Sequence, residues 1–348
     1  MKYPRYYTID IASSCNLRCS FCPEGQRINP QPKRSMTAAE FKIFTRDIIK
    51  HAQLIGLTNW TEPFVNSDIL EIVTYIKQKN SKIYVSLSTN GNSQKIGPQL
   101  ISNLFNAGLD SIEITLSGID QATYQIYHQG GKLQRVAETI YNIAHAKLRK
   151  GGNMPCIYLN FLTFPYNSAS LKRIKSWLYG FLKDSDLMRT INYIRPIRGT
   201  IMGNVRNNQN SMRKFNTIWG GHIFQLNFRP RCNFIFEHFY LRADGKVFPC
   251  CLVEYNEKYY LGNIAQDNFE LILQKREEFR SDFINGINSL CNRCTVLHGW
   301  LPLRNKAALY LNLRLLYLIF IHSLNKLDKA LFGEAFFRKK WSKKLEQL

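Results

Sequence analysis

Short apolar runs alternate with segments of helical periodicity along roughly the first 200 residues of the chain. Runs rich in apolar and β-branched side chains predict strands, whereas apolar residues spaced three and four apart predict helices. Thr37, followed three residues later by Glu40, predicts the start of a helix after the first strand. The whole pattern predicts six strands separated by helices, over residues 6–12, 53–58, 82–88, 111–117, 157–163 and 190–195.

This alternation predicts an α/β fold with a parallel sheet. Right-handed crossovers between six such units would form a partial (β/α)6 barrel of the TIM type over residues 1–205, before a polar, loop-like stretch at 203–210. Functional groups of such barrels lie at the carboxyl ends of the strands. Four polar residues near the ends of the last two strands either contact substrate there or only complete the rim: Asn160, Thr163, Arg195 and Arg198.

Composition and charge narrow the class of protein. The 348 residues suffice for a barrel and an additional domain, and 45% hydrophobic residues is ordinary for a globular chain. The most apolar stretch, 307–324, contains Asn312, Arg314 and His322, so no membrane-spanning helix is expected. The formal net charge of +22 favours an anionic substrate or membrane surface, or reflects only a basic exterior. No dense Lys/Arg cluster lies beside aromatic residues, so a nucleic-acid partner is not expected.

Three cysteines near the N-terminus, Cys15, Cys19 and Cys22, have the spacing C-x3-C-x2-C. At about 3.3 Å per extended residue, this segment can wrap a small inorganic cluster. An odd number of ligands, and nine cysteines without a secretory signal, favour a metal site in the reducing cytoplasm over a disulfide. Structural zinc usually takes four ligands, whereas a [4Fe–4S] cluster held by three thiolates leaves one iron open. Zinc remains the alternative.

This motif resembles the signature of the radical S-adenosylmethionine (radical SAM) enzymes and matches it without a gap. In that family the open iron chelates the amino and carboxylate groups of S-adenosylmethionine (SAM), and one electron cleaves SAM to a 5′-deoxyadenosyl radical. The resemblance therefore implies a [4Fe–4S] cluster and SAM as cofactors. It also implies an electron donor such as flavodoxin or ferredoxin.

Other positions resemble the cofactor-binding elements of the same family. Residues 59–63 resemble its Gly-Gly-Glu-Pro element, with a tryptophan and a threonine in place of glycines, although a Glu-Pro pair also fits an ordinary helix start. Residues 88–91 match its Ser-Thr-Asn-Gly run. His128 stands where many members have an arginine, and only its protonated form could anchor the SAM carboxylate. The resemblance implies cofactor-binding roles for Met36, Thr61, Glu62, Pro63, Ser88, Asn90, Ser117 and His128.

A second cysteine set follows the predicted barrel. Asp244 and Gly245 between two apolar runs predict a β-hairpin over 240–250, and a helix is predicted over 267–280. The spacing could bring four thiolates around one site, which would suit zinc as well as an iron–sulfur cluster. These four cysteines are Cys232, Cys250, Cys291 and Cys294.

This region resembles the SPASM domains of radical SAM enzymes and their shortened twitch relatives. The full pattern has seven cysteines and two auxiliary clusters, but Trp300 stands where the next cysteine is expected and no cysteine follows. The resemblance therefore implies one auxiliary [4Fe–4S] cluster in a small α+β domain over 206–300. The remaining segment, 301–348, has ten Lys/Arg and three Asp/Glu and predicts a helical tail. This tail either packs on the barrel or makes peripheral contact with an anionic membrane.

These features together predict an enzyme that removes a hydrogen atom from a carbon of its substrate. Relatives with a similar cysteine set resemble dehydrogenases and epimerases of sugars and aminocyclitols, and the positive charge favours a phosphorylated or nucleotide-linked sugar. Cys251 is a candidate catalytic thiol, because in a strand it would point away from Cys250 and could return a hydrogen to the substrate. A peptide-modifying maturase and a non-catalytic iron–sulfur sensor are the alternatives. Only five residues precede the first predicted strand, which favours a small molecule over a peptide.

Overall fold

A computed structural model of the chain describes residues 3–20, 22–27, 32–198, 232–251, 257–288 and 291. The chain divides into two compact units, Met1–Asn292 and Arg293–Leu348, and the described residues all belong to the first. Cys294, the predicted boundaries at 205 and 300, and the basic tail lie outside the described residues and stay predictions. No helix in the described ranges combines the length and apolarity needed to cross a membrane.

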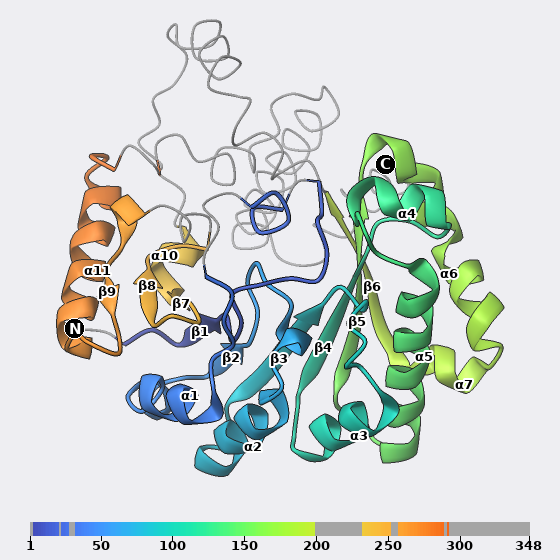
Figure 1. Cartoon of the computed structure of the whole chain (residues 1–348), viewed down its shortest axis with the longest axis horizontal. Helices are drawn as coiled ribbons and strands as arrows, with labels where there is room; N and C mark the ends of the chain where they lie inside the picture. Colours follow the sequence, from blue (N-terminus) through green and yellow to red (C-terminus); the bar gives the residue numbers. More distant parts are fainter. Residues whose placement is uncertain are drawn as a thin grey trace, which may run out of the picture. The chain divides into compact units, whose positions relative to one another are not determined.

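A nine-stranded sheet with the order β6-β5-β4-β3-β2-β1-β7-β8-β9 forms the centre of the described unit (Figure 1). Its first six strands are mutually parallel. The sheet is open, since β6 and β9 are its two edges, and this confirms the partial barrel. The six predicted strands correspond to β1 (Tyr6–Ile9), β2 (Leu54–Gly56), β3 (Tyr84–Thr89), β4 (Ser111–Leu116), β5 (Cys156–Thr163) and β6 (Ile191–Arg198).

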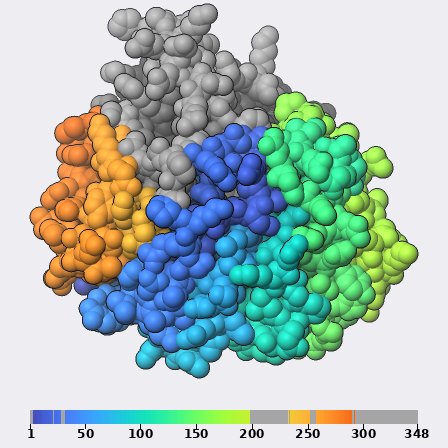
Figure 2. Space-filling view, viewed as in Figure 1, coloured from blue at the N-terminus to red at the C-terminus, as the bar shows by residue number. Residues whose placement is uncertain are grey.

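The predicted hairpin continues the same sheet. It consists of β7 (His238–Leu241) and β8 (Lys246–Phe248), which are antiparallel, and β9 (Gly262–Asn263) follows. β7 lies parallel to β1, with Tyr6 opposite His238. In the space-filling view the yellow and orange residues of this region lie directly against the blue N-terminal residues (Figure 2). The auxiliary region is therefore joined to the barrel through backbone pairing.

Helices cover the outer face of the parallel strands (Figure 1). Apolar strand residues such as Ile112 and Leu159 are fully buried in the same core as helix residues such as Ile101 and Ile140. Alternate residues, such as Glu113, point to the opposite, inner face. The helices are α1 (Ala38–Phe44), η1 (Ile48–Lys50), η2 (Pro63–Val65), α2 (Ile69–Lys79), α3 (Pro98–Asn106), α4 (Gln121–Tyr127), α5 (Leu133–Lys150), η3 (Pro165–Asn167), α6 (Ser168–Leu182), α7 (Ser185–Thr190), α10 (Asn233–Glu237), η5 (Glu257–Tyr259) and α11 (Phe269–Ile284).

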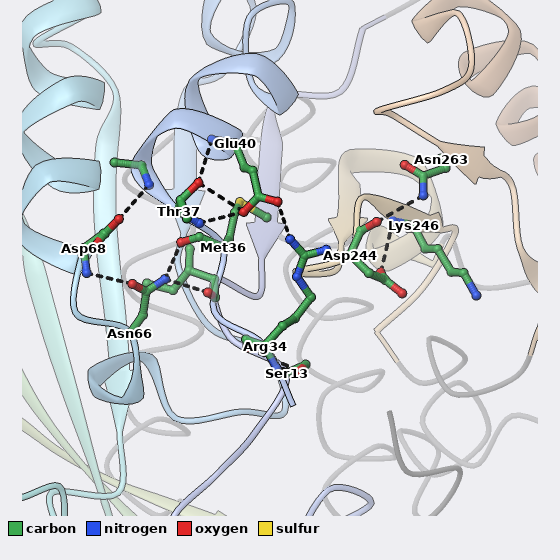
Figure 3. A network of polar contacts seen from close by, with 12 residues as sticks. Ser13, Arg34, Met36, Thr37, Glu40, Asn66, Asp68, Asp244, Lys246 and Asn263 are labelled. Atoms are coloured by element: carbon green, nitrogen blue, oxygen red, sulfur yellow. Dashed lines mark hydrogen bonds and ion pairs between the residues drawn. The ribbon is translucent and has the colours of Figure 1, made fainter. Parts of the chain in front are cut away.

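Local signals in the sequence explain several element boundaries. The Thr37 hydroxyl accepts a hydrogen bond from the Glu40 amide (3.1 Å), and the Glu40 carboxylate accepts one from the Thr37 amide (2.8 Å), which confirms the predicted helix start (Figure 3). Gly245 has a φ of 84°, and a Cβ there would overlap the Asn263 side chain. Only glycine fits this turn, which joins β7 to β8 and packs against Asn263 of β9.

Candidate active site

The three N-terminal cysteines lie in the loop between β1 and α1, and hydrogen bonds to the end of α4 hold this loop. The amide of Arg18 donates to the carbonyl of Gln129 (3.1 Å), and the amide of Ser20 donates to the carbonyl of Tyr127 (3.0 Å). The Ser20 hydroxyl also donates to the carbonyl of Ile126 (2.7 Å). The protein itself therefore holds the conformation of the cysteine loop.

The thiols of this loop lie within electrostatic reach of one another. Burial, with a contribution from Glu62, raises the pKa of Cys15 to about 12. Burial also raises the pKa of Cys19, and the neighbouring Cys22 and Cys15 raise it further. Among the described residues no three Cys, His, Asp or Glu side chains converge closely enough to hold one metal ion. Buried thiolates that repel one another need a positive group between them, and three thiols suit a multi-iron cluster with one open iron.

A buried carboxyl group, Asp10, organises the loop that follows β2. Its oxygens accept hydrogen bonds from the amide of Asn59 (2.8 Å), the hydroxyl of Thr61 (2.7 Å) and the amide of Trp60 (3.5 Å). Burial raises the pKa of Asp10, while these hydrogen bonds lower it. The carbonyl oxygen of Trp60 lies 3.9 Å from Cys22 Sγ. A backbone acceptor of this loop thus faces the cysteine site although the glycines are missing.

Glu62 connects the ends of β2 and β3 at the same edge of the sheet. Its carboxylate accepts hydrogen bonds from the hydroxyl of Thr89 (2.7 Å) and the amide of Asn90 (2.9 Å). Burial, only partly offset by these bonds, raises the pKa of Glu62 to about 7. The side-chain amide of Asn90 donates to Asn16 Oδ1 (2.9 Å) and lies 3.5 Å from Cys15 Sγ. The polar strand ends therefore meet the cysteine loop directly.

Two cysteines of the second set lie near a buried tyrosine, Tyr240. Cys232, Cys250 and Cys291 are buried, and Cys294 lies outside the described residues. Burial raises the pKa of Tyr240, and nearby thiols that include Cys250 and Cys232 raise it further. The Tyr240 hydroxyl therefore marks the place where two of the four predicted ligands approach each other.

A direct hydrogen-bonded link joins the two cysteine regions. Trp60 Nε1 donates to the carbonyl oxygen of Cys251 (2.6 Å), and Asn59 Nδ2 lies 3.5 Å from the same oxygen. The loop that faces Cys22 therefore also contacts the backbone beside Cys250. Neither contact could be expected from a single motif, since each cysteine set is local in sequence.

The expected orientation of Cys251 is wrong because the strand ends too early. β8 ends at Phe248, so Cys250 and Cys251 lie in a turn rather than on alternate faces of a strand. The Cys251 thiol raises the pKa of Tyr240, the same side chain that Cys250 influences. Both thiols therefore lie near one phenol, and strand alternation gives no reason for Cys251 to face the barrel mouth.

Comparison with known families identifies both regions. A profile described as the Radical SAM superfamily matches residues 9–165, and the SPASM iron–sulfur cluster-binding domain matches residues 232–295. The chain carries a radical SAM domain and a SPASM domain. It is therefore an enzyme, and its two domains imply [4Fe–4S] clusters and SAM as cofactors.

Curated relatives match mainly the barrel region. A probable GTP 3′,8-cyclase of Methanococcus maripaludis is 30% identical over 137 residues, which are 39% of this chain and 44% of that protein. A probable GTP 3′,8-cyclase of Methanocaldococcus jannaschii is 26% identical over 200 residues, or 57% and 62% of the two chains. The chain thus spans less than two thirds of the length of either relative.

Solved structures share the fold over most of the chain. BtrN in complex with AdoMet and 2-DOIA has a TM-score of 0.52 and 16% identity, covering 84% of this chain and 93% of BtrN. Streptococcus suis SuiB bound to S-adenosylmethionine has a TM-score of 0.56 and 12% identity, covering 85% and 71%. At these identities the likeness shows the radical SAM fold with its additional region.

Two residues that are expected to bind SAM from the family pattern have fully buried side chains. Met36 is fully buried in the core, and its carbonyl accepts a hydrogen bond from Asn66 (2.8 Å; Figure 3). Ser117 is also fully buried, and its hydroxyl lies 3.1 Å from the carbonyl oxygen of Tyr124 and 2.6 Å from His128 Nδ1. Neither side chain is open to a ligand, which corrects both assignments.

His128 cannot serve as the cationic anchor for the SAM carboxylate. It is 2% exposed and stacks on Tyr124 with ring centroids 4.7 Å apart. Burial lowers its pKa to about 3, so the ring is neutral near pH 7. The Ser117 hydroxyl lies within hydrogen-bond distance of both the Tyr124 carbonyl and His128 Nδ1, and the tautomer of His128 decides which of the two accepts its proton. His128 instead supports the segment whose carbonyls hold the cysteine loop.

The other family positions gather beside that loop. Thr61, Glu62, Pro63 and Asn90 follow β2 and β3, and Ser88 lies on β3 directly opposite Glu113 in register. Three features of the site are not predicted from the sequence: Asp10, the Trp60 contact with Cys251, and Tyr240. An acidic residue directly after the first strand was the available signal for Asp10. No local signal exists for the other two, because their partners are distant in sequence.

Proposed function

We propose that this radical SAM enzyme abstracts a hydrogen atom from a carbon of a sugar- or aminocyclitol-type substrate and oxidises it. The observation that carries the proposal is the meeting of the cysteine loop with the polar ends of β2 and β3, where Trp60 faces Cys22 and Asn90 faces Cys15. When bound, the cluster and SAM supply a one-electron cleavage that yields a 5′-deoxyadenosyl radical. A donor such as flavodoxin or ferredoxin provides the electron.

The roles of the residues follow from their geometry. Cys15, Cys19 and Cys22 would hold the cluster, and the carbonyl of Trp60, which faces Cys22, would be available to accept a hydrogen bond from the SAM amino group. The side-chain amide of Asn90, which donates to Asn16 beside Cys15, would be placed to donate to an acceptor on bound SAM. Glu62 positions the ends of β2 and β3 relative to each other, because its carboxylate accepts hydrogen bonds from the Asn90 amide and the Thr89 hydroxyl. None of these groups needs to move a proton for the reaction.

Oxidation is favoured over epimerisation by the position of the auxiliary region. The hydrogen bond from Trp60 to the Cys251 carbonyl brings this region next to the SAM loop, where an auxiliary cluster can accept the electron left on the substrate. The Cys251 thiol, the candidate hydrogen donor for epimerisation, lies near the buried Tyr240, whose pKa it raises. The likeness to BtrN, solved with AdoMet and 2-DOIA, supports a small-molecule substrate.

Peptide modification is the second candidate. SuiB bound to the precursor peptide SuiA has a TM-score of 0.54, comparable to that of BtrN. A radical SAM maturase would use the same cysteine loop and the same cofactors. Only the residues of the barrel that face the substrate can therefore distinguish a small-molecule substrate from a peptide substrate.

Anaerobic reconstitution tests the cofactor assignment. We expect about eight irons per chain, four in each cubane cluster, and formation of 5′-deoxyadenosine with dithionite and SAM. Replacing Cys15, Cys19 and Cys22 with alanine should remove about half of the iron and abolish 5′-deoxyadenosine. Replacing Cys232 and Cys250 should remove the other half. An iron content near four in the wild type, or zinc in the second site, would refute the auxiliary cluster.

A further inference from the structure

A polar cluster lies on the inner face of three neighbouring strands. Glu113 of β4, Asn160 of β5 and Arg195 of β6 contact one another: Asn160 Nδ2 donates to the Glu113 carboxylate (2.7 Å), and Arg195 Nη2 lies 3.5 Å from it. The alternate residues of these strands fill the helix-covered core. Since Glu113 is the register partner of Ser88, the cluster shares the face that leads to Asn90 and the cysteine loop.

Two polar atoms of this cluster lack partners. Asn160 is 5% exposed, and its Oδ1 has no hydrogen-bond partner among the described residues; the same holds for Arg195 Nε. Because a carboxylate only accepts, the Nδ2 of Asn160 must face Glu113, so the unpartnered atom is an acceptor. Buried polar atoms without a partner are rare and costly. A hydroxyl group could satisfy both, since it donates one hydrogen bond and accepts others.

Two tyrosines provide a flat apolar surface beside the cluster. Tyr158 and Tyr193 stack with centroids 5.2 Å apart, and the Arg195 guanidinium lies 3.7 Å from the centre of the Tyr158 ring. Tyr193 is 57% exposed, so much of its surface is open to a ligand. An aromatic surface next to hydroxyl-binding groups suits a saturated ring, which offers C–H bonds on its faces and hydroxyls at its rim.

The charges of the cluster select among such rings. Glu113 and Arg195 form an ion pair, so the cluster has no net charge, and a phosphate group at Arg195 would also meet the Glu113 carboxylate. An amine would find a favourable partner in Glu113 where it approaches the carboxylate from the side facing away from the Arg195 guanidinium. The local geometry therefore opposes the expectation, based on the net charge of +22, that the substrate is phosphorylated.

We propose that Glu113, Asn160 and Arg195 bind a neutral or amine-bearing polyol ring that rests on Tyr193. This inference depends on the proposed function, because it assigns the substrate subsite of the same barrel. In this subsite Asn160 Oδ1 accepts a hydrogen bond from a ring hydroxyl, and Arg195 Nε donates one to a ring oxygen. The Glu113 carboxylate accepts a hydrogen bond from the amine or from a second hydroxyl. Glu113 is in register with Ser88, which is two residues before Asn90, so the cluster lies on the same inner face as the residues that lead to the SAM site.

Calorimetric titration of the reconstituted, SAM-loaded enzyme tests this subsite with three probes: myo-inositol, glucosamine and glucose 6-phosphate. We expect Asn160→Leu to weaken binding of the first two about tenfold or more. Glu113→Gln should weaken glucosamine more than myo-inositol, because it removes the charge that meets the amine. Because Asn160 is buried, its replacement could disturb the fold, so Tyr193→Ala, at an exposed position, provides an independent variant. We expect Tyr193→Ala to weaken binding of myo-inositol and glucosamine by a similar factor.

Glu138→Gln is the matched control, since the same chemical change is made on the exposed outer side of α5. It should leave every dissociation constant unchanged, and iron content should be equal in all variants. Binding of glucose 6-phosphate alone, equal affinities in all variants, or no binding of any probe would overturn the polyol subsite. Absence of 5′-deoxyadenosine from the wild type with dithionite would instead refute the proposed function, whatever the probes show.

Discussion

His128 is buried without charge, and this affects how stability depends on pH. Its pKa of about 3 in the fold lies below the value of 6.5 expected in the unfolded chain. Between these values only the unfolded chain binds the proton, so the stability contribution is lost as pH falls, by up to about 1.4 kcal/mol per pH unit. We expect the stability advantage of wild type over His128→Gln to shrink between about pH 6.5 and pH 5 in denaturant unfolding of the reconstituted protein.

The contribution of Glu62 to stability depends on pH in the opposite direction. Burial raises its pKa from 4.5 to about 7, so the folded protein holds a proton that the unfolded chain has released. This contribution is present at low pH and is lost as pH rises toward 7, again by up to about 1.4 kcal/mol per pH unit. The advantage of wild type over Glu62→Gln should therefore shrink from about pH 5 to pH 7. A difference independent of pH in either variant would contradict the burial that the structure assigns.

The contact between the β2 loop and the auxiliary region belongs to the scale of elements. Trp60→Phe keeps an aromatic ring but removes the N–H that donates to Cys251. Losing one such hydrogen bond costs roughly 0.5–1.5 kcal/mol. We expect the effect of this loss to be confined to the auxiliary region beside Cys251. The signal of the auxiliary cluster in electron paramagnetic resonance should broaden or shift, while SAM still perturbs the N-terminal cluster.

Trp177→Phe provides the control for this substitution, because Trp177 packs against Phe181 on α6, far in sequence from both cysteine regions. It should leave both cluster signals unchanged. An unaltered auxiliary signal in Trp60→Phe would show that the contact has no influence on the second site.

The sequence predicts the boundaries of the secondary-structure elements better than their pairing with distant elements. The strands of the barrel were predicted to within a few residues, because apolar alternation and flanking turns are local signals. The hairpin was predicted too, but its pairing with β1 was not, since nothing near Tyr6 indicates that His238 will lie opposite. The family pattern located the cysteine loop and Glu62. It gave wrong roles to Ser117 and His128, because a motif does not report burial.

At the scale of the whole unit, the turn at Gly245 holds the auxiliary strands on the barrel sheet. Gly245→Ala would place a Cβ against Asn263 and force a residue with a side chain to a φ of 84°. Such a conformation costs of order 1–3 kcal/mol. Since β7 and β1 share one sheet, we expect this loss in a single unfolding transition that releases both clusters together.

Gly97→Ala is the matched control for this prediction. A Cβ at Gly97 has open space, and its φ of −108° is ordinary for any residue. The variant should unfold at the same denaturant concentration as wild type. Two separate transitions in Gly245→Ala, one for each cluster, would show that barrel and hairpin unfold independently.

The pairing of β1 with β7 also restricts how substrate can enter. Four residue pairs, from Tyr6 and His238 to Ile9 and Leu241, join the two strands, and Asp10 donates its amide to Leu241 just beyond them. A hinge between the barrel and the auxiliary strands would have to break this ladder at every turnover. We therefore expect admission of substrate and release of product to depend on loops at the rim, while the β1–β7 pairing keeps the two strands themselves at a fixed separation.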